Sequence, residues 1–181
     1  MKLLDLIKKR QSDRKYDVDR KVPRELLEQI VEAARWAPSA TNGQPWHFII
    51  VDEPELKAEV ASALTSAVVG KMNHFAQEAP ALIVIVEESS NLAGRTGSLL
   101  LRNHLPHLDI GIAAAHITLA ATELGLGSCI MGWVMQKKMR KILGLPKSRS
   151  VPLVVAVGYS LEQQKNKKRK SFEEICSWNE Y

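Results

Sequence analysis

DIGIAAAHITLAATEL, residues 109–124, is the stretch that decides the fold. Asp109 can cap a helix over 110–124, and Gly125 stands where a glycine usually ends one. Apolar residues occupy nearly every face of this helix, which is typical of a helix buried on all sides. At 1.5 Å per residue it would run roughly 22 Å. Because a chain of 181 residues has few layers to cover it, we expect a subunit interface on one of its faces.

On either side of this helix, shorter helices and strands follow one another without the regularity of a doubly wound sheet. Periodicity predicts helices over 3–9, 23–36, 54–65 and 137–143, and strands over 46–51, 81–88, 128–134 and 151–159. Asp52 and Glu55 form a capping-box pattern before the third helix. Residues 66–79 read as a loop with a helical turn, and 89–108 as either a mobile lid or a short helix. The fold class we expect is α+β, a single domain over 1–181 with a mixed sheet flanked by helices on both faces.

Composition limits the classes of protein further. The chain is 45% hydrophobic and 25% charged, with a net charge of +5 and a pI near 9.2. Such a surface attracts anions but does not identify them. Two cysteines make no disulfide framework, so a cytoplasmic setting is expected. No signal peptide is visible, and the longest apolar stretch is shorter than the roughly 20 residues a bilayer needs, so no membrane association is expected.

Two polar segments carry the candidate binding chemistry. KKRQSDRKYD, residues 8–17, places Arg10, Ser12 and Arg14 close together, and converging guanidiniums with a hydroxyl suit a phosphate dianion. The alternative is a solvated basic face. PSATNGQPW, residues 38–46, is either an ordinary turn-rich loop or a loop whose Asn42 and Gln44 amides meet the edge of a flat heterocyclic ring.

Two further segments have both a structural and a functional interpretation. GLGSCIMGW, residues 125–133, follows a helix and enters a strand, so it is not a dinucleotide fingerprint, which follows a strand and opens a helix. It is either a helix cap with a strand, or a backbone surface along a ring through residues 129–132. KNKKRK, residues 165–170, is either a solvated tail, a nucleic-acid patch or a second source of phosphate ligands, Lys168 and Arg169 above all.

Histidines and cysteines give no second site. His104, His107 and Asp109 have metal-ligand spacing, but we expect Pro106 to interrupt any helix there, and no third ligand is evident, so no metal is predicted. Cys129 lacks a basic neighbour in sequence that would lower its pKa, which argues against a nucleophilic hydrolase. His116 lies on an apolar helix and is interpreted as a core or interface histidine.

Taken in order, five pieces of the chain resemble the FMN-binding nitroreductase family. They are Arg10–Arg14, Pro38–Trp46, the strand after Ala79–Pro80, the stretch Asp109–Met131 with Gly132–Trp133, and the terminal Lys168–Arg169–Lys170. Together they span nearly the whole chain. The resemblance implies a nitroreductase-like three-layer fold and an intertwined homodimer with two FMN sites at the subunit interface.

The resemblance also implies a role for each matched segment. Arg10, Ser12 and the terminal basic residues would hold the phosphate, and Arg14 would stabilise the anionic reduced ring. Residues 39–44 would come from the partner subunit. Many members have a second arginine where this chain has Gln11. The implied cofactor-binding residues are Arg10, Gln11, Ser12, Arg14, Pro38, Ser39, Ala40, Asn42, Gln44, Cys129, Ile130, Met131, Gly132, Lys168 and Arg169.

The activity implied is an FMN-dependent oxidoreductase with NAD(P)H as co-substrate. Hydride would pass through the flavin to a small electrophilic acceptor, such as a nitroaromatic or a quinone, in a ping-pong cycle. The flavin carries the chemistry, so no catalytic side chain is required. One alternative is a flavin-holding or sensory protein of the same fold without nicotinamide turnover. A nucleic-acid-binding module is another alternative, but nucleic acid is not the expected partner, because no aromatic residues interleave the basic ones.

Overall fold

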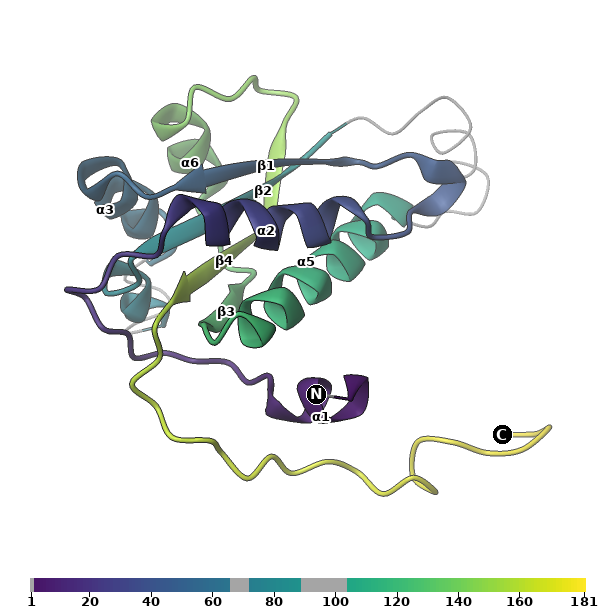
Figure 1. Ribbon diagram of the computed structural model, residues 1–181. Coiled ribbons are helices and arrows are strands. Elements are labelled where there is room, and N and C mark those ends of the chain that lie inside the picture. Colours follow the sequence, from purple (N-terminus) through teal and green to yellow (C-terminus); the bar gives the residue numbers. More distant parts are fainter. Residues whose placement is uncertain (1, 66–71, 89–103) are drawn as a thin grey trace.

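A computed structural model describes residues 2–65, 72–88 and 104–181. It places one sheet between two layers of helices (Figure 1). The strands are β1 (Trp46–Val51), β2 (Ala81–Glu87), β3 (Gly127–Met131) and β4 (Ser150–Gly158), in the spatial order β1-β2-β4-β3. The helices are α1 (Leu3–Lys9), α2 (Arg24–Arg35), α3 (Pro54–Ser62), α5 (Leu105–Glu123) and α6 (Gln136–Ile142), with the short 3-10 helices η1 (Ala40–Asn42) and η3 (His74–Gln77). The expected three-layer α+β fold is confirmed.

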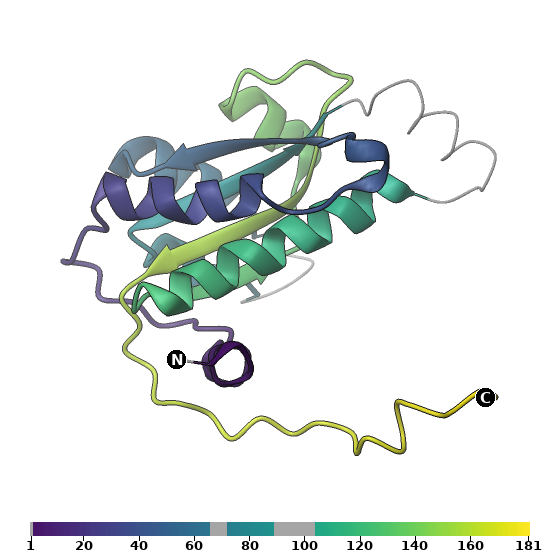
Figure 2. The ribbon, with the colours of Figure 1, turned by 45° about the vertical axis from the view of Figure 1, so that its right-hand side comes forward.

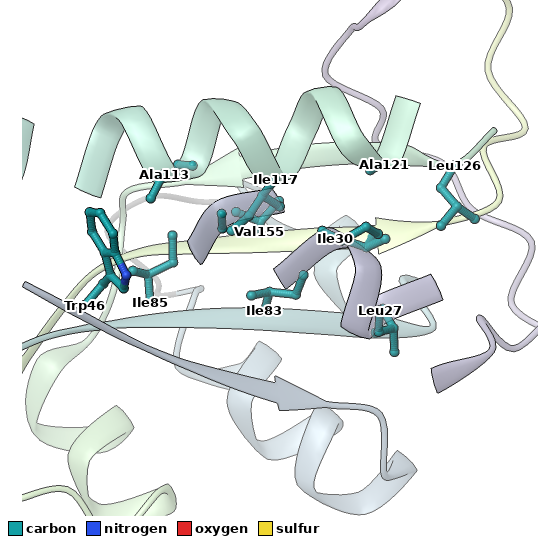
Figure 3. Close-up of a cluster of buried hydrophobic side chains, with 14 of the residues drawn as sticks. Leu27, Ile30, Trp46, Ile83, Ile85, Ala113, Ile117, Ala121, Leu126 and Val155 are labelled. Atoms are coloured by element: carbon teal, nitrogen blue, oxygen red, sulfur yellow. The ribbon is translucent and has the colours of Figure 1, made fainter. Parts of the chain in front are cut away.

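The core lies on both faces of the sheet. On one face, Ile83 of β2 and Val155 of β4 pack against Ile30 of α2 and Ile117 of α5 (Figure 3). On the other face, α3 and α6 cover the sheet with residues such as Met139. Each fully buried aliphatic side chain of this kind stabilises the fold by about 1.5–3 kcal/mol relative to exposure. The central strand β2 is buried from residue 81 to residue 86, as its β-branched run predicts.

The sheet is antiparallel rather than mixed in the part of the chain that the structure describes. β1 pairs with β2, β2 with β4, and β4 with β3, all antiparallel. The one parallel pairing there is an isolated bridge between Ser12 and Ser128. Alternation of helices and strands along a chain does not fix strand direction, and the expected mixed sheet is therefore corrected.

The long helix α5 begins earlier than expected. It starts at Leu105, with Pro106 in its first turn, where a missing N–H costs nothing. The expectation that Pro106 interrupts a helix is wrong, and Asp109 lies inside the helix instead of capping it. Gly125 follows α5 with φ of +77°, the left-handed conformation of a usual helix end.

One stripe of α5 stays exposed within a single chain. Leu108 is 63% exposed and Ile112 39%, and Gly111 and Ala115 on the same stripe are also exposed. The opposite stripe packs on the sheet and on α2. The helix is thus not buried on all sides by its own chain.

Both ends of the chain run over the outside of these layers. The segment after α1 pairs with the chain beyond β4 through a bridge between Tyr16 and Ser160. Residues 168–181 are exposed throughout and extend away from the body (Figure 1, Figure 2). Across the described ranges, no helix combines the length and the apolar character needed to cross a membrane.

Candidate functional site

A cavity of about 420 Å³ opens beside the edge strand β3. Its wall is formed by residues 129–132, and Arg14 lies across from them. The structure therefore brings Arg14 together with the four residues expected to line a flat ring. Residues that the sequence analysis did not assign complete the lining: Met72, Asn73, Phe75 and Trp133.

Arg14 is held at the cavity by its backbone more than by its side chain. Its N–H donates to the Glu162 carboxylate at 2.8 Å, and its guanidinium carbon lies 5.9 Å from the centre of the Phe75 ring. Partial burial would raise the pKa of Glu162, but hydrogen bonds from Lys165 and from the Arg14 N–H outweigh it and lower that pKa. The Arg14 guanidinium stays exposed and forms none of the salt bridges described, so it is available to a ligand.

Cys129 is a wall residue and not a nucleophile. It is 3% exposed, and burial raises the pKa of its thiol above the usual range, against the smaller opposing effect of the Arg14 charge. Ser12 lies beside this residue, because it forms an isolated bridge with the adjacent Ser128. The contact places Ser12 at the junction between the cavity and the chain segment that carries Arg10.

A second cavity, a groove of about 610 Å³, lies between α1 and residues 164–169. We call it the cationic groove. Lys167 Nζ donates to the Arg10 carbonyl at 2.7 Å and also to the Lys8 carbonyl. Burial, and then the charges of Arg10 and Arg169, lower the pKa of Lys167, against the smaller opposing effect of the Asp13 charge. The basic residues lining the groove are Lys8, Lys9, Arg10, Lys165, Lys167 and Arg169.

The groove distinguishes between the two tail residues named from the sequence. Arg169 faces Arg10 across the groove, whereas Lys168 is not among the lining residues and Lys167 is. The uncharged Gln164 and Asn166 also line the groove, so the lining does not follow a simple alternation along the tail. The run KNKKRK could not by itself show which of its cations line the groove.

The loop 38–45 has a constrained backbone and exposed amides. Asn42 and Gln44 have φ of +52° and +46°, a conformation that non-glycine residues seldom adopt. Ser39 Oγ accepts a hydrogen bond from the Gln44 N–H at 3.0 Å, and Gln44 Nε2 donates to Asn42 Oδ1 at 3.2 Å. The Ala40 N–H donates to Asp109 Oδ1 at 3.0 Å. Held in this way, the loop presents polar groups outward at the first turns of α5.

A single chain does not bring this loop to the cavity. The loop leads into β1, and the cavity lies at β3, the opposite edge of the sheet, three strand spacings or roughly 14 Å away. Lys9 and Gln11 lie against Thr122 and Gly125, at the other end of α5 from the loop (Figure 1, Figure 2). One small ligand cannot contact Arg10 and residues 39–44 of the same chain.

Several residues at the site had no clear signal in the sequence. Asn73, whose φ is +62°, donates from Nδ2 to the Leu64 carbonyl, and Phe75 follows in η3. Both lie in the segment expected to be a loop with a helical turn. Trp133, 41% exposed, ends the quoted GLGSCIMGW segment and could have been assigned by its position alone.

The histidines singled out in the sequence lie in two different surroundings. His116 Nδ1 lies 3.0 Å from the Ala33 carbonyl, so its ring N–H donates between helices, as a satisfied core histidine does. His104 and His107 stack with ring centres 5.5 Å apart, and His107 Nε2 lies 3.3 Å from Glu87 Oε2. Among the described residues, no three His, Cys, Asp or Glu side chains gather as a metal site would require.

Comparison with known proteins gives this arrangement a family. The sequence model described as "Nitroreductase family" matches residues 7–159, which is most of the chain. The chain belongs to the nitroreductase family. A relative from Archaeoglobus fulgidus is 34% identical over 165 residues, 89% of this chain and 87% of its own. Another, from Methanothermobacter thermautotrophicus, is 32% identical over 166 residues, 90% of this chain and 79% of its own. Both are provisionally named NADH dehydrogenase or NAD(P)H nitroreductase.

Solved structures of nitroreductases share the architecture. An FMN-dependent nitroreductase from Clostridium difficile R20291 is 30% identical, has a TM-score of 0.76 and covers 99% of this chain and all of its own. A nitroreductase family protein from Streptococcus pneumoniae reaches a TM-score of 0.82 at 25% identity, over 98% of this chain. Family membership makes the protein an oxidoreductase. The names of these relatives agree with the FMN and NAD(P)H that the sequence resemblance implied.

Proposed function

We propose that the protein is a homodimeric flavoenzyme that holds FMN and passes hydride from NAD(P)H to a small electrophilic acceptor. The observation that carries the proposal is the adjacency of two cavities. One is lined by Arg14 and residues 129–132, and the other is the cationic groove, lined by Arg10; Ser12, on the chain segment between the two arginines, bridges to Ser128. A ligand with a planar ring at one end and a phosphate at the other would place its ring in the first cavity and its phosphate in the cationic groove.

The residues present fit such a cofactor. The cationic groove offers Arg10, Lys167 and Arg169 to a phosphate, and forked guanidiniums bind phosphate through paired hydrogen bonds. When bound, FMN supplies hydride transfer in two successive half-reactions. Arg14 places a positive charge beside the ring cavity, and a fixed charge at the position where negative charge develops lowers the barrier.

The second copy of the chain supplies what one copy lacks. Pro38, Ser39, Ala40, Asn42 and Gln44 would reach the flavin of the partner subunit, because they cannot reach the cavity of their own. The exposed apolar stripe of α5 gives the dimer an interface. Exposed apolar side chains of α1 and of the C-terminal residues 168–181 add to this interface. They include Leu3, Leu4, Ile7, Phe172, Ile175 and Trp178. Exposed apolar surface of this extent is typical of sites of protein contact.

The chemistry balances without a further reductant. NAD(P)H and one proton convert a quinone into a hydroquinone, or a nitro group into a nitroso group and water, leaving NAD(P)⁺. The chain's part is to bind, to orient and to supply charge. We further propose that it works in the cytoplasm, where its two free cysteines stay reduced.

Colour and bleaching test the proposal directly. The purified protein, or the apoprotein after addition of FMN, should be yellow and should elute as a dimer in size-exclusion chromatography with light scattering. Under nitrogen, NADH or NADPH should bleach the flavin absorption, and a quinone added afterwards should restore it. A protein that is colourless after incubation with excess FMN and removal of the unbound flavin refutes the proposal. A yellow protein that neither nicotinamide bleaches favours instead a flavin-holding or sensory role.

A further inference from the structure

A buried hydrogen-bond network joins the N-terminal segment, residues 10–14, to the C-terminal tail, residues 160–169, whose last residues line the cationic groove. Asp13 is 4% exposed, and its Oδ1 accepts from Gln11 Nε2 at 2.9 Å and from Ser160 Oγ at 2.7 Å. Its Oδ2 accepts from the Ser128 N–H at 3.3 Å. One carboxylate thus binds three parts of the chain that lie far apart in sequence.

Gln11 extends the network along the tail. Besides its bond to Asp13, Gln11 Nε2 donates to the Gln163 carbonyl at 3.2 Å, and Gln11 Oε1 accepts from the Lys165 N–H at 2.9 Å. The side chain is 8% exposed. A primary amide suits this place because it donates and accepts at once, which a guanidinium cannot do.

The backbone of β3 at Gly127 lies very close to the Asp13 carboxylate. A Cβ on Gly127 would lie 2.9 Å from Asp13 Oδ2 and 2.7 Å from the Cβ of Ser160. Only a glycine lets the tail and the Asp13 carboxylate approach β3 this closely. The packing therefore supports the hydrogen bonds.

We propose that Gln11 is a positioning residue that, together with Asp13, clips the tail to the N-terminal segment and so holds the tail cations over the phosphate-binding groove. The proposal rests on the function proposed above. The clip fixes the tail backbone at residues 163 and 165, and Lys167 and Arg169 follow in the same extended run, facing Arg10. Both ends of the Gln11 amide are engaged by Asp13, by the Gln163 carbonyl and by the Lys165 N–H, and Gln11 does not line the groove, so it contributes to phosphate binding through the placement of cations on other residues.

The clip also offsets a repulsion. Lys167 lies close enough to Arg10 and Arg169 for their charges to help lower its pKa. This repulsion favours a tail that moves away from the body, although the charge of the Asp13 carboxylate counteracts it in part. The hydrogen bonds of Gln11, Asp13 and Ser160 also oppose that movement, so the groove keeps its cations in place before the ligand arrives. Preorganisation of this kind raises affinity without adding a contact.

The test compares two flavins that differ only in the phosphate. Affinities of the apoprotein for FMN and for riboflavin are measured by fluorescence quenching, for the wild type, Gln11→Ala and Gln163→Ala. The Gln163 side chain is exposed and only its backbone carbonyl takes part, so Gln163→Ala is a matched control. In Gln11→Ala we expect the Kd for FMN to rise roughly tenfold, the scale of one charged hydrogen bond, with the Kd for riboflavin unchanged.

The outcomes separate placement from general stability. A fall in the preference for FMN over riboflavin in Gln11→Ala, but not in Gln163→Ala, supports the clip. Equal weakening of both flavins, or an unchanged preference, overturns it. If Gln11→Ala does not fold, Ser160→Ala removes the bond to Asp13 together with the acceptor of the Glu162 N–H, and should shift the same preference by a smaller factor; an unshifted preference in that variant overturns the clip as well. A wild type that binds neither flavin refutes the proposed function itself.

Discussion

Asp109, in the second turn of α5, accepts a hydrogen bond from the backbone N–H of Ala40 at 3.0 Å. The carboxylate is 6% exposed, so the bond is shielded from water. It ties the loop 38–45 to the helix whose exposed stripe we assign to the dimer interface. The loop 38–45, which we propose contacts the flavin of the partner subunit, is therefore fixed to α5, the helix that we propose forms the dimer interface.

Replacing Asp109 with alanine should weaken FMN binding although the residue does not touch the flavin site of its own chain. Loss of a hydrogen bond to a buried carboxylate costs about 1.5–3 kcal/mol and frees the loop. Asp109→Asn keeps an acceptor for the Ala40 N–H and should retain most of the affinity. Thermal melting and FMN titration measure both effects. Equal FMN affinity in the wild type and Asp109→Ala would remove the loop from the site.

Arg10 should contribute to phosphate affinity directly. Arg10→Ala removes a cation of the groove and should weaken FMN binding by about one to a few kcal/mol, the scale of charged hydrogen bonds. Lys15→Ala removes a cation from the same segment, but an exposed one that does not line the groove. It serves as the control and should leave the Kd unchanged. Titration curves for the two variants that coincide would place the phosphate elsewhere.

A charge on the exposed stripe of α5 should separate the subunits. Ile112 is 39% exposed in one chain, and Ile112→Glu would bury a carboxylate in the dimer, at a cost of several kcal/mol. Light scattering should then report a monomer, and FMN should dissociate because each site loses its second loop. Gln29→Glu, on an exposed position of α2, is the matched control and should stay dimeric. A dimeric, yellow Ile112→Glu protein would contradict the assigned interface.

Local sequence patterns predicted the helices and strands well where hydrophobic burial alone decides the structure. The run 81–88 is apolar and β-branched, and β2 covers Ala81–Glu87. The start of α5 was missed because a proline stops a helix in its interior but not in its first turn, and only the fold shows which applies to Pro106. Strand direction was missed because it depends on pairing between distant residues, which periodicity does not record.

Site residues could be predicted where chemistry and position coincide. Arg14 and Cys129 were identified from polar and glycine-rich segments, and the structure places both at one cavity. Asp13 looked like one more charged residue in a basic run, and nothing local shows that it is buried under Ser160. Gln11 was noted for lacking a charge, whereas its role depends on tail atoms more than 150 positions away.

Gly127 offers a test of the packing around Asp13 that does not require a cofactor. In Gly127→Ala the new methyl would lie within 3 Å of both Asp13 and Ser160, so the tail or the carboxylate must shift. Overpacking of this kind costs about 1–3 kcal/mol. Urea denaturation measures the loss in the free energy of unfolding. A variant as stable as the wild type would show that the tail lifts off β3 without cost.

The pairing of Asp52 with Arg24 predicts a small, pH-dependent contribution to stability. Arg24 donates from Nε and Nη2 to the two carboxylate oxygens at 2.7 and 3.0 Å, and these bonds lower the pKa of Asp52 below its ordinary 3.8. A depressed folded-state pKa adds stability that is present above 3.8 and is lost as the pH falls through the folded value.

Because Arg24 is 68% exposed, that contribution should stay within about 1 kcal/mol. Asp52→Asn should thus be less stable than the wild type at pH 7, and the difference should shrink as the pH falls below 3.8 and vanish once the pH is below the folded-state pKa of Asp52. Glu59→Gln, an exposed carboxylate of α3, is the control and should show no such difference. The sequence predicted that Asp52 caps α3. That prediction is wrong, because α3 has no side-chain cap and Asp52 binds Arg24, the first residue of α2, instead. A destabilisation of Asp52→Asn that persisted in acid would therefore assign the effect to lost packing and not to the ion pair.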